Sequence, residues 1–445
     1  MLPLESASLL RERRLRYAIV TSLGSKATTA IIQIVALPVA LAALGQQQFV
    51  LYAMLASAVG WLGLVNIGVG PPLTVMMSEA AASGDRVEQQ RLFASALLPV
   101  AIVVLTTGIA VAIALRVVPM EWLFGATYAA DRTTVVEGLL ILTAVFLVQT
   151  LVAVVEAAQL GYQEQYRLNA MAIGGNLASA IAIIAVATVR PTVVGMIAAV
   201  SLPPLLFRIA NAVDVLWRRP HLRLRPALVS KQVSRQLVGS GLAFSLATGF
   251  GNFLCHQLPI ILVGRRLPSD EAASFAVSMN ALLIAAGMVS MVTVSLWPAI
   301  ADGMARGERG WVEHASRRTL RYSVGYGLLV GAAFAVFGRF LFSVWFGAAI
   351  DVGPALSLTL GVYFFLLMWE NAYFAILIGM KEIAVPSLLY IGRSLFAVML
   401  MHILVGRIGA PAAFIALAAS VCVFTLLPFR ARVRRVLRDH GSSHA

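Results

Sequence analysis

The stretch TSLGSKATTAIIQIVALP, from Thr21 to Pro38, places a lysine well inside a long apolar run. Runs of about twenty apolar residues are long enough to cross a hydrocarbon core about 30 Å thick. Because a charge at that depth costs free energy, Lys26 either reaches back to the membrane surface or faces a polar interior that uses it. The stretch therefore predicts a membrane-spanning helix and makes Lys26 a candidate functional residue.

The composition of the whole chain agrees with a membrane protein. Of its 445 residues 60% are hydrophobic and 12% are charged, and the mean hydropathy is +0.87. Soluble domains are nearer to about one quarter charged. The apolar runs are continuous rather than alternating, which favours helices over a membrane β-barrel. Cys255 and Cys422 both fall inside apolar runs, so we expect no disulfide framework, metal site or cofactor.

The apolar runs predict an all-α integral membrane protein with about 12 transmembrane helices. The expected spans are residues 17–44, 49–77, 93–119, 134–160, 168–189, 192–216, 236–264, 271–303, 320–346, 353–380, 383–406 and 409–428. We expect two six-helix bundles around a central cavity. The predicted domains are an N-terminal bundle (1–217), a basic cytoplasmic linker (218–235), a C-terminal bundle (236–428) and a basic cytoplasmic tail (429–445).

The basic residues predict the orientation of the chain. With the N-terminus in the cytoplasm, 24 of the 34 Lys and Arg fall on the cytoplasmic side and seven fall outside, which is a positive-inside bias. We therefore expect a multi-pass protein of the bacterial cytoplasmic (inner) membrane with both termini in the cytoplasm. The net charge of +14 then reflects the basic residues that orient the chain in the membrane, and it does not predict a nucleic-acid partner. The linker either lies on the inner leaflet or is simply solvated.

The two halves of the chain resemble each other. SEAAASGDR (78–86) follows the second expected span, and IADGMARGER (300–309) follows the eighth. GYQEQYRLNAMAIGG (161–175) follows the fourth span, and GMKEIAVPSLLYIGR (379–393) follows the tenth. Together these matches favour two six-helix halves in parallel orientation, an architecture common in transporters.

Two corresponding spans each carry a stripe of polar residues at helical spacing. The stripe of the first span is Ser22, Lys26, Thr29 and Gln33, and that of the seventh is Ser245, Thr248, Asn252 and His256. Such spacing places each set on one face of a helix. Since polar groups facing lipid are costly, each stripe either lines a cavity or packs against neighbouring helices.

Four charged residues lie at similar depths in their spans. They are Lys26, Arg208, Glu370 and Arg393, roughly 12–18 Å from the cytoplasmic end at 1.5 Å per residue. A cationic, water-accessible layer suits an anionic headgroup, because phosphate and pyrophosphate favour Arg and Lys. Glu370 is a candidate for binding a coupling proton or cation. The alternatives are that the basic side chains snorkel to the surface and that Glu370 forms an ion pair with Arg393.

The first third of the chain resembles the polysaccharide and O-antigen flippases of the multidrug/oligosaccharidyl-lipid/polysaccharide exporter superfamily. The resemblance is carried by Ser22–Asp85, which reads as a polar first helix, a Leu-Gly turn, WLGLVNIGVG and an acidic-Gly loop. The G-x-x-E loops at Gly161 and Gly379 and the twelve-span layout extend it over nearly the whole chain.

The resemblance implies a V-shaped pair of six-helix bundles and transport by alternating access. It also implies a substrate, a polyprenyl-pyrophosphate-linked oligosaccharide flipped from the cytoplasmic to the periplasmic leaflet for cell-surface polysaccharide export. The resemblance also implies coupling to a proton or sodium gradient. Membrane lipids and polysaccharide assembly proteins are the expected partners. The expected substrate-binding residues are Lys26, Arg208, Arg393, Ser22, Thr29, Gln33, Asn252 and His256, with Glu370 in ion coupling.

Other functions remain open from the sequence, among them an ion-coupled solute carrier. A cation-coupled multidrug antiporter of the same superfamily has a similar topology, but an acidic cavity is expected of it, whereas the first span carries Lys26 and no Asp or Glu. A membrane glycosyltransferase or polymerase would need acids or metal ligands clustered in an outer loop, and the outer loops are short. The sequence therefore predicts a transporter and not an enzyme.

Overall fold

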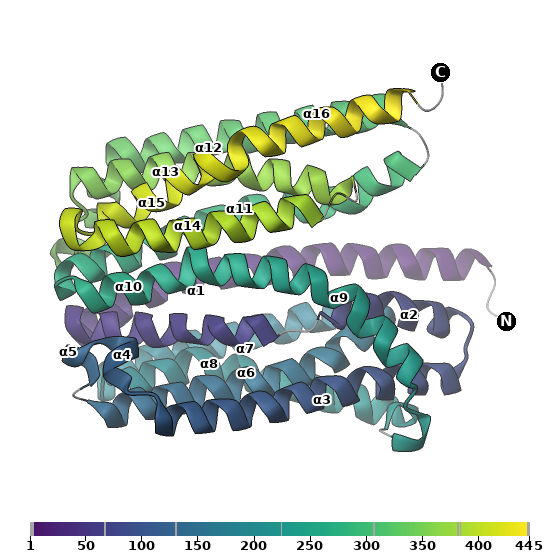
Figure 1. Cartoon of the computed structure of the whole chain (residues 1–445). Helices are drawn as coiled ribbons and strands as arrows, with labels where there is room; N and C mark the ends of the chain where they lie inside the picture. Colours follow the sequence, from purple (N-terminus) through teal and green to yellow (C-terminus); the bar gives the residue numbers. More distant parts are fainter. Residues whose placement is uncertain are drawn as a thin grey trace. The chain divides into compact units, whose positions relative to one another are not determined.

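The computed structural model describes the backbone of residues 4–65, 68–129, 131–223, 225–305, 308–380, 382 and 384–442, and nearly all of it is helical (Figure 1). Side chains are described from Thr21 onward except at residues 23, 61, 64–67, 129–130, 224, 240–248, 250, 290–299, 301–303, 305–307, 309, 348, 381, 383–384 and 437–445. A helix satisfies its backbone hydrogen bonds internally, as a lipid environment requires. The chain is an all-α, multi-pass membrane protein, as predicted.

The chain divides into two compact units, Met1–Gly249 and Phe250–Ala445. The first unit contains α1 (Leu4–Ala58), η1 (Val59–Val65), α2 (Gly70–Ala82), α3 (Arg86–Val117), α4 (Met120–Phe124), α5 (Ala126–Ala129), α6 (Arg132–Gly161), α7 (Gln165–Val189), α8 (Val193–Arg218), η2 (Pro220–Leu222), η3 (Pro226–Leu228) and most of α9 (Lys231–Asn252). The second contains η4 (Phe253–Gln257), α10 (Leu258–Arg266), α11 (Ser269–Ala305), α12 (Arg309–Phe346), η5 (Gly347–Ala349), α13 (Pro354–Gly379), α14 (Ala384–Ile408), α15 (Pro411–Val421), η6 (Cys422–Leu426) and α16 (Leu427–Ser442). The domain boundaries and the central cavity expected from the sequence stay predictions.

Ten helices in the described part of the chain are long and apolar enough to cross a membrane. Three of the expected spans are interrupted, and the one at 409–428 comprises α15, the π-helical segment η6 and the start of α16. The span at 49–77 is not one continuous helix, because it comprises the end of α1, the 3-10 segment η1 and α2. The span at 236–264 comprises α9, the π-helical segment η4 and α10.

The Leu-Gly turn after the first span is present at Gly45. Its backbone leaves helical geometry with φ 71° and ψ 167°, so α1 consists of two helices joined at this residue. A positive φ of this size is strained for residues that carry a Cβ atom and is freely adopted by glycine. Gly45 therefore ends the first expected span where the sequence placed its turn.

Side-chain caps fix the starts of three long helices in the first unit. Asp85 accepts hydrogen bonds from the backbone N–H groups of Val87 and Glu88, at 3.0 and 2.9 Å, at the start of α3. Asp131 and Thr192 cap α6 and α8 in the same way. Such caps satisfy N–H groups that have no partner within the helix.

The basic segment after α8 packs on the first unit rather than projecting as a solvated linker. Leu222 is fully buried. The Gln90 side-chain amide donates to the backbone oxygen of Arg223 at 2.9 Å, and the Ser230 N–H donates to Ser95 Oγ at 2.9 Å. These contacts hold the segment against α3.

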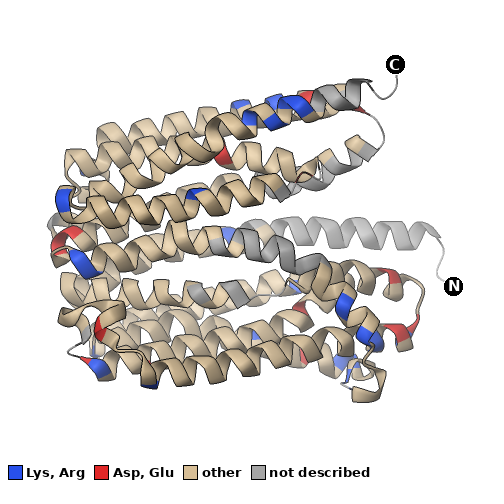
Figure 2. Ribbon diagram, viewed as in Figure 1, with Lys and Arg blue, Asp and Glu red and all other residues tan. Residues whose placement is uncertain are grey.

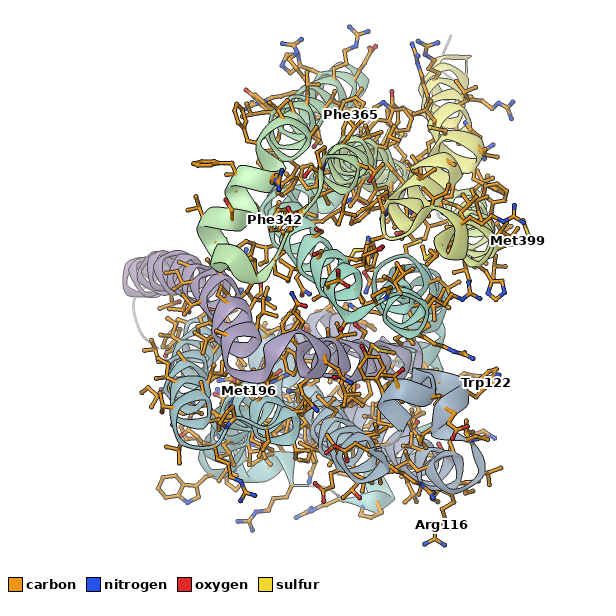
Figure 3. All side chains as sticks on the ribbon, turned by 90° about the vertical axis from the view of Figure 1, so that its left-hand side faces the viewer. Arg116, Trp122, Met196, Phe342, Phe365 and Met399 are labelled. Carbon is orange, nitrogen blue, oxygen red and sulfur yellow. The ribbon has the colours of Figure 1, made fainter. Side chains whose placement is uncertain are left out.

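Apolar side chains cover the surface of the helices as well as their interior. Val69, Leu73 and Val155 belong to the buried core of the first unit. Viewed along the helices, Trp122 and Met399 project outward while Met196 lies among helices (Figure 3), in agreement with exposures of 61%, 55% and 0%. Acidic and basic residues gather at helix ends and are sparse along the middle of the helices (Figure 2). The few charges in the middle of helices are therefore the natural place to look for a site.

Candidate functional site

The polar stripe of α1 is exposed along much of its length. Lys26, Thr29 and Gln33 are exposed and Ser22 is half-buried. Across the described part of the chain, no carboxylate forms an ion pair with Lys26. Lys26 is thus an exposed cation within a membrane-spanning helix that has no ionic partner among the described residues.

Two asparagines of α7 bind the threonines that flank Lys26. Asn176 Nδ2 donates to Thr29 Oγ1 at 2.8 Å, and Asn169 Nδ2 donates to Thr21 Oγ1 at 3.3 Å. Part of the stripe thus packs against another helix. Packing of this kind was one of the two interpretations of the stripe, the other being that it lines a cavity. The asparagines were missed from the sequence, although their spacing of seven residues places both on one face of α7.

Arg208 of α8 forms an ion pair with Glu156 of α6. Arg208 Nε lies 2.7 Å from Glu156 Oε1, and Arg208 Nη2 lies 2.6 Å from Glu156 Oε2. The Glu156 side chain is 14% exposed and that of Arg208 is 32% exposed. The sequence singled out Arg208 but not its partner, which lies near the C-terminal end of the fourth expected span. Arg208 is therefore neutralised by a carboxylate and does not stand as a free cation.

A second polar pair lies one helical turn further along the same two helices. Asn211 Nδ2 donates to Gln159 Oε1 at 2.7 Å, and Gln159 Nε2 donates to Asn211 Oδ1 at 3.2 Å. Both side chains are buried, and each amide satisfies the other. The two pairs together fix the register of α8 against α6.

A cavity of about 200 Å³ opens beside Arg208 in the first unit. Its walls come from the start of α2 and from α3, α6 and α8. The lining is mainly apolar, with Val100, Val103 and Phe146, and its polar groups are Gln149, Thr150 and Arg208. This lining offers apolar surface and a few polar groups to one ligand.

Arg393 and Glu370 meet in the interior of the second unit. Arg393 Nη1 lies 2.7 Å from Glu370 Oε2, and both side chains are fully buried. Arg393 Nη2 also donates to the hydroxyl of Tyr363 at 3.2 Å, and the guanidinium lies over the Tyr390 ring at 5.1 Å from its centre. The ion pair given as the alternative for Glu370 is therefore present, and in this state neither side chain is accessible to a ligand.

Two π-helical segments pack against the helix that carries Arg393. They are η4 and η6, and both contact α14. Cys255 of η4 donates from its thiol to Ser394 Oγ at 3.3 Å. Single π-helical turns inside α-helices are frequent at functional sites. Both segments therefore contact the helix that carries Arg393 of the buried ion pair.

The described part of the polar stripe in the second unit is Asn252 and His256. Their side chains interact, with His256 Nδ1 3.0 Å from Asn252 Oδ1. His256 is buried, and its Nε2 has no hydrogen-bond partner in the described part of the chain. The Ser245 and Thr248 side chains lie outside the described residues.

The G-x-x-E loops of the two halves make equivalent ion pairs. Glu164 Oε1 lies 2.7 Å from Arg219 Nη2 and 3.2 Å from Arg218 Nη1, at the end of α8. Glu382 Oε2 lies 2.9 Å from Arg432 Nη2, on α16. In each half the loop after the fourth span is thus tied to the last helix, which extends the internal repeat from sequence to contacts.

The charges around Glu164 hold it ionised. Burial acts to raise its pKa, but the hydrogen bonds and positive charge of Arg219, followed by those of Arg218, outweigh burial. The pKa of Glu164 consequently lies below its ordinary value of 4.5.

Solved transporter structures share this arrangement of helices. An inward-facing multidrug resistance MATE family transporter of the MOP superfamily superposes with a TM-score of 0.76 at 15% identity, covering 94% of this chain and 96% of that chain. This protein has the fold of the MOP superfamily transporters. A MOP superfamily transporter from Pyrococcus furiosus superposes with a TM-score of 0.64 at 16% identity, covering 96% of each chain.

Another solved structure with the MOP transporter fold is the Vibrio cholerae MATE transporter VcmN in its bent form. It superposes with a TM-score of 0.58 at 15% identity, covering 95% of this chain and 98% of that chain. The sequence matches no protein-family model and no curated protein. The coverage on both sides extends the MOP transporter fold over nearly the whole chain. The fold alone does not identify the substrate, which depends on the side chains of the binding site.

Proposed function

We propose that this protein is an alternating-access transporter that flips a polyprenyl-pyrophosphate-linked oligosaccharide from the cytoplasmic to the periplasmic leaflet. The proposal places it in the bacterial inner membrane, with both termini in the cytoplasm, in the export of cell-surface polysaccharide. In this proposal the protein is a multi-pass transporter and not an enzyme. Membrane lipids and polysaccharide assembly proteins are its proposed partners.

The observation that carries the proposal is the state of Lys26. Its side chain is exposed on α1 without a carboxylate partner in the described part of the chain, and no Asp or Glu occurs between residues 17 and 78. An ammonium group within a membrane helix gains most from an anion that enters the membrane region. Pyrophosphate is such an anion and is well suited to Lys and Arg.

Neutral polar groups around Lys26 suit the sugar part of the substrate. Ser22, Thr29 and Gln33 supply hydroxyl and amide groups on the same face of α1, and Asn176 extends this set onto α7. Hydroxyl and amide groups donate and accept hydrogen bonds to sugar hydroxyls. In the first unit the proposed binding set is therefore Lys26 and Arg208 for phosphate and the neutral groups for sugar.

The second unit is proposed to couple transport to an ion. Glu370 carries the coupling, because protonating its carboxylate weakens its attraction to Arg393. Released in this way, Arg393 becomes a ligand for the anionic substrate together with Asn252 and His256. The Nε2 atom of His256 has no hydrogen-bond partner among the described residues, which supports a role for that ring beyond packing.

One of the solved structures with this fold is described by the words "Reverse polarity of binding pocket suggests different function of a MOP superfamily transporter". Those words concern the Pyrococcus furiosus protein. They support the general point that the charge in the pocket and the substrate vary together on this fold. A cationic first helix fits an anionic substrate better than an organic cation.

The second candidate function is cation-coupled multidrug antiport. It is favoured by the MATE multidrug resistance transporter among the solved structures with this fold and by the Glu156 carboxylate next to the cavity. An organic cation would need a carboxylate free to receive it, whereas Glu156 and Glu370 are both engaged by arginines.

Proteoliposomes that contain the native protein distinguish the two functions. We expect movement of a fluorescent polyprenyl-pyrophosphate oligosaccharide between leaflets, with and without imposed proton and sodium gradients. We expect no gradient-driven transport of an organic cation such as ethidium by the same preparation. Ethidium transport without lipid flipping would instead establish the antiporter.

A further inference from the structure

In the cavity beside Arg208, the arginine guanidinium is paired with the Glu156 carboxylate. Glu156 binds Arg208 through Nε and Nη2, and no hydrogen bond joins Nη1 to a described residue. A guanidinium group has five N–H donors. The pair therefore neutralises Arg208 while leaving one edge of the group available.

The remaining polar group of the cavity is also available. No hydrogen bond joins the half-buried Gln149 side chain to another described residue, whereas Thr150 Oγ1 donates to the backbone oxygen of Phe146 at 2.8 Å. Gly70, at the start of α2, also lines the cavity, and a helix N-terminus carries partial positive charge. Arg208, Gln149 and the helix end thus all line a cavity that is otherwise mainly apolar.

We propose that this cavity binds the phosphate end of an anionic lipid and that Glu156 is its internal competitor, holding Arg208 until the phosphate displaces it. The inference rests on the proposed function, whose substrate has this chemistry. It adds a binding place in the first unit, an apolar wall for the first part of the lipid chain, and a role for Glu156 that the sequence does not indicate.

The size of the cavity restricts what it holds. Drug-sized ligands occupy pockets of about 300–1,000 Å³, and this cavity measures about 200 Å³. It accommodates a phosphate group with a short piece of chain and not an oligosaccharide. The sugars would lie outside it.

The exchange of one anion for another suits a transporter. An unpaired arginine in the membrane is costly, so Glu156 keeps the empty cavity electrically neutral. When a phosphate replaces the carboxylate, Arg208 remains paired, but the displaced Glu156 carboxylate loses its partner, and this cost opposes loading. When the phosphate leaves, the carboxylate returns. Glu156 therefore sets a moderate affinity, which permits release on the far side.

The test measures binding of farnesyl pyrophosphate to the detergent-solubilised full chain by isothermal titration calorimetry. Glu156→Gln removes the competing charge, and we expect it to bind at least about tenfold more tightly than the native protein. Arg208→Ala is expected to bind at least about tenfold more weakly. The double variant E156Q/R208A is expected to resemble R208A, because the gain requires the arginine.

Two controls accompany these variants. Glu382→Gln removes a carboxylate that is likewise bound to an arginine but lies in the second unit, and its affinity should equal that of the native protein. Farnesol, which lacks the pyrophosphate, should bind all variants alike. If E156Q does not purify folded, Glu156→Asp takes its place, since the shorter side chain weakens the pair in the same direction.

Equal or weaker binding by folded E156Q would overturn the competitor role, even if the native protein flips lipid-linked oligosaccharide. Tighter binding that persists in E156Q/R208A would place the ligand elsewhere and would overturn the cavity. A failure of the proposed function alone would give a different result. The native protein would then not flip the lipid-linked oligosaccharide, while E156Q would still bind farnesyl pyrophosphate more tightly than the native protein.

Discussion

Arg393 and Glu370 face each other from α14 and α13, with Arg393 Nη1 2.7 Å from Glu370 Oε2 and both side chains fully buried. Removing one member of a buried ion pair leaves the other charge without compensation, at a cost of about 3–5 kcal/mol. We expect Arg393→Met to lower the thermal stability of the purified protein strongly. The double variant R393M/E370L, which buries no charge, should recover most of the loss.

Thermal unfolding in detergent, followed by intrinsic fluorescence, checks this order of stabilities. Tyr363→Phe serves as the matched control, because it removes only the hydroxyl that accepts from Arg393 Nη2 and should cost less than loss of the ion pair, about 1–3 kcal/mol. The pair would not be a structural element if R393M melted at the temperature of the native protein.

The same double variant tests ion coupling. If Glu370 binds the coupling ion, folded R393M/E370L should no longer respond to an imposed proton or sodium gradient in the flipping assay, whereas the native protein should. A gradient response of native size in this variant would remove Glu370 from the coupling mechanism and leave the pair a purely structural role.

The stability contributed by Glu164 should depend on pH. Because its pKa is lowered in the folded state, the contribution is fully present above the ordinary value of 4.5 and is lost as the pH falls through the folded-state value. Glu164→Gln should lower stability near pH 7 by roughly 1.5–3 kcal/mol, and the difference from the native protein should shrink on acidification below 4.5.

Melting curves of native protein and E164Q across this pH range provide the measurement. Glu313→Gln is a suitable control, because Glu313 is exposed and its pair among the described residues is Arg317 on the same helix; such pairs are worth about 0–1 kcal/mol. A stability difference for E164Q that stays constant with pH would exclude the Arg218 and Arg219 interactions as its source.

Gly251 permits the close approach of the Tyr390 ring. A Cβ atom at residue 251 would overlap the ring, and Tyr390 in turn packs on the Arg393 guanidinium. We expect Gly251→Ala to destabilise the second unit by about 1–3 kcal/mol. The same change in a Tyr390→Ala background should cost much less, because the obstructing ring is gone.

This prediction requires a double-mutant cycle on thermal stability. An equal cost for G251A in both backgrounds would show that the glycine is required for some reason other than the ring.

Hydropathy and charge placement predicted the fold class, because a membrane restricts the chain to helices and leaves a strong compositional signal. The turn at Gly45 was predictable since Leu-Gly interrupts an apolar run. The interruption of the second span by η1 was not, because 3-10 and α-helical segments share the same apolar composition.

The depth argument found Arg208, Glu370 and Arg393 because charges are rare in membrane helices. It identified the Glu370–Arg393 pair only as an alternative, and it missed Glu156 altogether. Glu156 and Arg208 are separated by 52 residues, and their pairing depends on how α6 and α8 pack. The same holds for Asn176 and Thr29, whose contact follows from the packing of α7 on α1.

The most direct test of the central claim is the flipping of a fluorescent polyprenyl-pyrophosphate oligosaccharide by Lys26 variants at equal reconstitution. Lys26→Ala and Lys26→Glu should lose most of the activity, with the charge reversal worse, while Lys26→Arg should retain it because the positive charge persists. Flipping by folded K26A at the rate of the native protein would contradict an anionic substrate held at the first helix.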